Sequence, residues 1–139
     1  MNFLDTNVFL HYLIDGDPAQ DQAAQIIDSI ENGNCDVWTT DVHIHEVVYV
    51  LASPRVYGLR HSDIAARLRP LLEMRGLKLA NKQSCLEALD IFDQYEALDF
   101  ADALAVADMR REGIDTILSF DHDFDAVEGI IRSQSVVGR

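Results

Sequence analysis

Residues 1–7 read MNFLDTN, and this stretch decides the fold class because an apolar run leads straight into an aspartate. Met1–Leu4 predicts a short buried strand that ends at Asp5. The same arrangement returns at Thr116–Ser119, a second apolar strand that is soon followed by Asp121. Open parallel sheets bind ligands just beyond the carboxyl ends of their strands, so both aspartates are expected at one crevice.

Strands and helices are predicted to alternate along the rest of the chain. Further strands are expected at Val37–Thr39, Leu77–Leu79 and Ser135–Val137. Helices are expected after Asp17-Pro18, after Thr40 or Asp41, from Ser62 with a kink or restart at Pro70, from Asn81, and from Asp99 to Gly113. The alternation predicts one α/β domain over residues 1–139, a sandwich whose mostly parallel, roughly five-stranded sheet is flanked by helices.

The composition excludes several classes of protein. No apolar run approaches the roughly 20 residues that a membrane span needs, and the first residues are not a signal peptide. The two cysteines, Cys35 and Cys85, have no CxxC-type neighbours. A disulfide framework and a structural zinc site are therefore not expected, and a reducing cytoplasm is the predicted location.

The net charge of -13 argues against a general nucleic-acid coat protein, because phosphate binding normally rests on Lys and Arg. Either the acids form a well-solvated surface, or some converge on a metal ion that presents positive charge to an anionic substrate. Residues 55–82 differ, since they hold seven of the 11 basic residues, Arg67, Arg69 and Arg75 among them. This basic stretch is either a solvated helix face or a surface for a phosphate backbone or an acidic partner.

Four acids from separate segments are predicted to face the same end of the sheet: Asp5, Glu46, Asp102 and Asp121. Asp99 and Asp102 share a helix face through their i,i+3 spacing. Asp99 also suits a simple N-cap, and Asp102 could serve only the helix dipole. However, Asp102 stands in an apolar run over residues 100–106, where an unpaired charge would be costly.

Repulsion among these carboxylates predicts a bound cation. Two carboxylates about 6 Å apart repel by roughly 3 kcal/mol at an effective dielectric of about 20. Six such pairs cost on the order of 15 kcal/mol, which is comparable to the stability of a whole domain. Oxygen ligands without His or Cys favour Mg²⁺ or Mn²⁺, which can activate a water for phosphodiester hydrolysis.

Three other motifs are incomplete. Residues 121–125 begin like a calcium loop, but Ala126 replaces the turn glycine and Arg132 stands where the last ligand should be. His43 and His45 resemble a zinc pair, yet an HxH pair on a helix points its rings to different faces. Ser119 and Cys85 have no adjacent base, so covalent catalysis is unsupported.

Four motifs in this order resemble the PIN-domain proteins, and specifically the VapC-type toxins of toxin–antitoxin pairs. They are Phe3-Leu4-Asp5-Thr6-Asn7, Glu46-Val47, Asp99-Phe100-Ala101-Asp102-Ala103 and Ser119-Phe120-Asp121-His122-Asp123-Phe124. The resemblance implies that Asp5, Glu46, Asp102 and Asp121 bind Mg²⁺ or Mn²⁺, with support from Asp99 and Asp123, and that Thr6 orients Asp5 or a water. Whether Asp121 or Asp123 is the more direct ligand stays open.

The resemblance also implies an endoribonuclease that cuts single-stranded or structured RNA, a homodimer, and an antitoxin whose tail enters the groove. Arg67, Arg69 and Arg75 would then hold the RNA backbone beside the acids. Two alternatives stay open. One is a non-catalytic module that keeps the fold only to dock a partner. The other is a haloacid-dehalogenase-type phosphatase, which needs a second aspartate where Asn7 stands.

Overall fold

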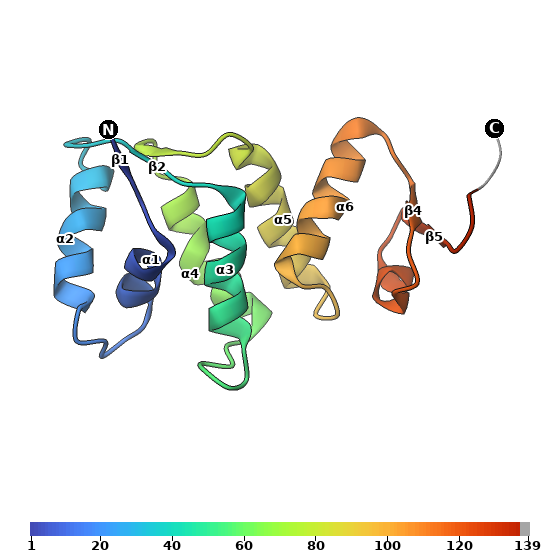
Figure 1. Ribbon diagram of the computed structural model, residues 1–139, viewed down its shortest axis with the longest axis horizontal. Coiled ribbons are helices and arrows are strands. Elements are labelled where there is room, and N and C mark those ends of the chain that lie inside the picture. The colour runs from blue at the N-terminus through green and yellow to red at the C-terminus, as the bar shows by residue number, and fades with distance from the viewer. Residues whose placement is uncertain (137–139) are drawn as a thin grey trace.

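The computed structural model describes residues 1–136, in which strands and helices follow one another along the chain (Figure 1). In chain order the elements are β1 (Asn2–Phe3), α1 (Thr6–Leu13), α2 (Gln20–Glu31), β2 (Val37–Trp38), α3 (Asp41–Ala52), α4 (His61–Leu72), β3 (Leu77–Lys78), α5 (Lys82–Gln94), α6 (Phe100–Glu112), β4 (Thr116–Leu118), the 3-10 helix η1 (His122–Ala126) and β5 (Ile131–Ser133). The predicted α/β class with parallel strands is confirmed.

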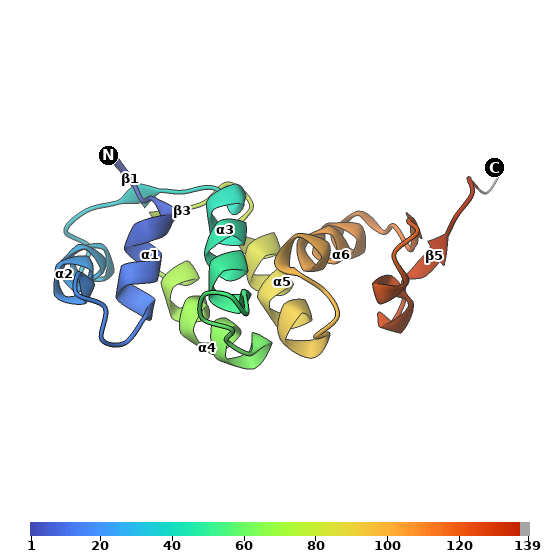
Figure 2. The same cartoon turned by 60° about the horizontal axis from the view of Figure 1, so that its bottom comes forward.

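The predicted five-stranded sheet is wrong, because the strands form two separate parallel sheets. One sheet has the order β1-β2-β3, with Asn2 opposite Val37 and Val37 opposite Leu77. The other contains β4 and β5, with Thr116 opposite Ile131. The division arises because α6 packs along α5 and carries β4 and β5 to the opposite end of the molecule from β1 (Figures 1 and 2).

Two strand predictions are corrected by this arrangement. The first strand is not buried: Asn2 and Phe3 are exposed, and only Leu4 beside them is buried. Strand β1 is at the edge of its sheet, and no strand within residues 1–136 pairs with its outer side. The last strand lies at residues 131–133, whereas the predicted one falls at 135–137, whose final residue lies outside the described part.

Local chemistry explains the start of α3 and the end of α6. The Thr40 hydroxyl accepts a hydrogen bond from the His43 backbone N–H, which caps α3. Gly113 ends α6 in the left-handed conformation, with φ of 71°, as glycine readily does. Helix α4 runs through Pro70 to Leu72 without a restart, and the proline lies only two residues from the helix end. Helix α1, which begins directly after Asp5, was not predicted.

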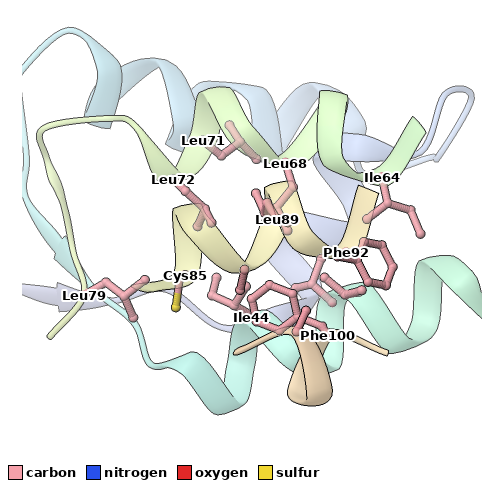
Figure 3. Packing of buried hydrophobic residues seen from close by; sticks show 14 of the residues in the cluster. Ile44, Ile64, Leu68, Leu71, Leu72, Leu79, Cys85, Leu89, Phe92 and Phe100 are labelled. Atoms are coloured by element: carbon pink, nitrogen blue, oxygen red, sulfur yellow. The ribbon is translucent and has the colours of Figure 1, made fainter. Parts of the chain in front are cut away.

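The core lies between the helices, where the Phe92 and Phe100 rings lie near one another among aliphatic side chains (Figure 3). Phe92 of α5 stacks on His61 with the ring centroids 3.7 Å apart, and it meets the edge of Phe100 of α6 at 6.5 Å. Ile44, Leu68 and Leu89 are fully buried around these rings. The described helices include none that is long and apolar enough to cross a membrane, and both cysteines are free.

Replacing Phe92 by alanine should cost about 3–5 kcal/mol of unfolding free energy, because the cavity cannot close between two other rings. Urea denaturation measures this cost. Val56→Ala is the control, because Val56 is 56% exposed in the turn after α3 and its truncation should change stability by less than about 0.5 kcal/mol. Equal effects of the two substitutions would contradict the packing described.

Candidate functional site

Three of the predicted site residues, Asp5, Thr6 and Glu46, lie close together where β1 ends and α1 begins. Asp5 occupies the N-cap position of α1, and Thr6 is its first residue. The buried Thr6 hydroxyl donates a hydrogen bond of 3.1 Å to Glu46 Oε2 on α3. Thr6 was expected to orient Asp5 or a bound water, and in the structure its hydroxyl donates to Glu46. The contact holds the Glu46 carboxylate beside the carboxyl end of β1.

His43 belongs to the same group, and sequence analysis considered it only as half of a zinc pair. Its Nε2 lies 3.7 Å from Asp5 Oδ1, and its Nδ1 lies 2.6 Å from the Thr40 hydroxyl. The ring also meets Phe3 of β1 edge to face. The i,i+3 spacing of His43 and Glu46 on one helix is the signal that could have identified it. We call Asp5, Thr6, His43 and Glu46 the N-terminal half-site.

The remaining predicted acids gather around the start of α6. Asp99 caps α6 by accepting a 2.8 Å hydrogen bond from the Asp102 backbone N–H, which confirms its predicted capping role. Asp121 likewise begins η1 and accepts a 2.9 Å bond from the Asp123 N–H. We call Asp99, Asp102, Asp121 and Asp123 the C-terminal half-site.

Mutual repulsion marks this C-terminal half-site. Burial, with the neighbouring Asp99 and then Asp121 carboxylates, raises the pKa of Asp102 to about 6. The pKa of Asp123 is also raised, chiefly by the charge of Asp121. None of the groups that act on Asp102 is a cation. Asp102 therefore lies in the negative field of Asp99 and Asp121 without a compensating cation.

The structure does not join the two half-sites. Among residues 1–136, no three His, Cys, Asp or Glu side chains lie close enough together to hold one metal ion. Asp5, Glu46 and Asp121 are exposed, so the apolar residues beside them in sequence do not bury them. The donors are hard oxygens that suit Mg²⁺ or Mn²⁺. They would supply enough ligands only if both half-sites met.

The incomplete motifs have other roles in the structure. Arg132 Nε binds Asp125 Oδ1 at 2.7 Å, and Arg132 also donates to the Ser119 carbonyl oxygen, which ties β5 to both ends of the turn at η1. His45 lines a cavity of about 290 Å³ with Tyr49 and Asp99, whereas His43 contacts Asp5 and Thr40. Burial raises the pKa of the Cys85 thiol to about 12, which keeps it neutral.

The basic residues on α4 point in different directions. Arg67 donates to the Leu13 carbonyl oxygen at the end of α1, with Asp15 3.9 Å away. Arg69 forms an ion pair with Asp90 of α5. Arg75 lies beyond the helix and is exposed. Their role in holding a phosphate backbone stays a prediction.

Substituting Asp102 should change how stability depends on pH. Its folded-state pKa of about 6 exceeds the ordinary aspartate value of 3.8, so between these two pH values the folded protein binds more protons than the unfolded chain. The contribution of Asp102 to the stability of the fold is therefore complete below about pH 4. This contribution is lost as the pH rises through about 6. We expect Asp102→Asn to gain thermal stability over the wild type at about pH 7 and to lose this advantage near pH 4.

Thermal unfolding at both pH values measures the effect, which solvent screening of this partly exposed side chain keeps small. Asp108→Asn, an exposed change on the same helix, is the control. If Asp102→Asn and the wild type shift in parallel with pH, the repulsion described for Asp102 is wrong.

Comparisons with known proteins give two findings. The family model of the PIN domain matches residues 3–130. Among solved structures, the chain is similar to VapC20 of Mycobacterium tuberculosis, a sarcin–ricin loop cleaving toxin, at 22% identity and a TM-score of 0.42. The likeness covers 91% of this chain and 94% of that one. No curated protein matches the sequence.

Proposed function

Because the chain belongs to the PIN-domain family, we propose that it is a divalent-metal-dependent endoribonuclease, the toxin of a toxin–antitoxin pair of the VapC type. The observation that carries this proposal is the uncompensated field at Asp102. Asp102 is partly buried beside the Asp99 and Asp121 carboxylates, with no cation among the groups that act on it, and a bound divalent cation relieves this costly arrangement.

Asp5, Glu46, Asp102 and Asp121 would hold the metal, with Asp99 and Asp123 in support. A bound Mg²⁺ or Mn²⁺ supplies an activated water and stabilises the leaving oxygen of a phosphodiester. The protein positions its own ligands: the Thr6 hydroxyl holds Glu46, and the caps formed by Asp99 and Asp121 fix two carboxylates. The proposal includes an RNA substrate, a cognate antitoxin and action in the cytoplasm.

The test is incubation of the purified, partner-free protein with total RNA in Mg²⁺, in Mn²⁺ and in chelator. We expect metal-dependent cleavage, and a loss of at least about 100-fold in Asp5→Asn and in Asp102→Asn, because each loses several kcal/mol of charge stabilisation. Asp28→Asn, an exposed acid on α2, is the control and should cleave like the wild type. Equal cleavage by all four proteins would refute the carboxylate mechanism.

A second candidate is a non-catalytic binding module. The observation in its favour is that, within residues 1–136 of a single chain, no three acidic side chains lie close enough together to bind one metal ion. Such a module would bind its partner equally well with and without metal and would leave every RNA intact. The same incubations therefore separate the two candidates.

Replacing Arg67 and Arg69 tests whether these side chains bind the RNA backbone. Their joint replacement by alanine should weaken RNA binding and reduce the slope of log affinity against log salt concentration by up to about 2, or about 1 for each lost phosphate contact. Fluorescence anisotropy over a salt series measures the slope. Arg111→Ala is the control, since Arg111 binds Glu87 and Ser84 on the other side of α5. An unchanged slope would place the RNA elsewhere.

A further inference from the structure

The first sheet has a free edge at β1. In the order β1-β2-β3, β1 hydrogen-bonds to β2 on one side and to no strand of the described chain on the other. The apolar side chains in and beside β1 are exposed to solvent, with Phe3 51% and the preceding Met1 77% exposed. Natural proteins seldom leave such an edge uncovered, because its unpaired N–H and C=O groups invite another strand.

The second sheet has a matching free edge at β4. A two-stranded sheet is marginal on its own, and in the part of the chain that the structure describes β4 pairs with β5 alone. Apolar side chains in and around this pair are more than half exposed: Ile114, Leu118, Phe120 and Ile131. The second sheet therefore lacks the strand and the apolar cover that the first sheet could give it.

Strands β1 and β4 can pair in the same parallel direction that the other strand pairs have. Every strand pair in both sheets is parallel, so placing β4 beside β1 would give one parallel sheet in the order β3-β2-β1-β4-β5. Adjacent parallel strands end at the same side of a sheet, about 5 Å apart. Asp5, which follows β1, would then lie beside the segment that follows β4 and contains Asp121. This pairing joins the two half-sites.

A chain cannot make this pairing with its own β4 while α6 stays on α5. Gly113–Asp115, the link between α6 and β4, has three residues and spans at most about 11 Å. A single helix is already about 10 Å wide. In Figures 1 and 2, α3, α5 and α6 all stand between β1 and β4. Helix α6 is held there by Phe100, Ala103 and Ala107, which are buried in the core.

We propose that two copies of this chain share their active sites, with β4 of each copy paired to β1 of the other. Each site then combines the N-terminal half-site of one copy with the C-terminal half-site of its partner. Two equivalent contacts of this kind close a two-fold dimer and leave neither edge free. The inference rests on the proposed nuclease function for its activity test, but the pairing itself can be measured without activity.

The decisive experiment mixes two inactive variants, Asp5→Asn and Asp121→Asn, by unfolding and refolding them together. Half of the dimers should be mixed, and each mixed dimer has one complete site, so about a quarter of the wild-type RNA cleavage should return. The matched control is Asp5→Asn with Glu46→Gln. Both changes lie in the same half-site, so that mixture should stay inactive. An active wild type with no recovery in the first mixture would overturn shared sites.

A cross-linking readout separates this inference from the nuclease proposal. One tagged chain has Phe3→Cys, and an untagged chain has Ile117→Cys, Leu118→Cys or Ser119→Cys, which together cover both faces of β4. Oxidation should give a disulfide between the two chains even if no RNA is cut. A protein that stays at its monomer mass of 15.6 kDa and gives no cross-link overturns the pairing. A chain that carries both Phe3→Cys and Leu118→Cys should likewise form no disulfide within one monomer, and such a disulfide would also overturn the pairing.

Discussion

The packing of α6 against α5 determines where the last third of the chain lies. Ala88 on α5 and Ala103 and Ala107 on α6 are completely buried, and such small residues allow two helices to approach closely. The edge contact between Phe92 and Phe100 fixes the N-terminal end of α6. Strands β4 and β5 follow after three residues, so their separation from β1 is a consequence of this helix contact.

The same separation has an electrostatic effect. With its acids divided between two half-sites, a single chain avoids most of the repulsion that four converging carboxylates would cause. The part that remains is concentrated at Asp102, whose pKa is raised to about 6 by burial and by Asp99 and Asp121. Bringing the half-sites together adds repulsion, which a cation offsets. In our proposal, metal binding and assembly of the site therefore favour one another.

Sequence predicted the features that depend on neighbouring residues. Thr40, Asp99 and Gly113 mark helix ends through hydrogen bonds or backbone conformations that act within one turn. Helix α1 was missed because Asp5 makes no side-chain capping bond that would distinguish its start from the end of β1. The pairing of β4, and hence the single sheet, depends on where α6 packs, which no local pattern encodes. Likewise, the acids were identified as candidates, but their division into two half-sites was not.

The contacts of Arg132 have a consequence for how the C-terminal half-site would dock. This side chain, only 13% exposed, joins β5 to Asp125 and to the Ser119 carbonyl oxygen on either side of Asp121. Asp121 is thus placed by bonds within its own segment before any other half-site arrives. Preorganisation of this kind means that docking loses mainly rigid-body freedom rather than loop entropy. The C-terminal half-site would consequently be preassembled, so that β1 of a partner copy could bind beside it without rearranging it.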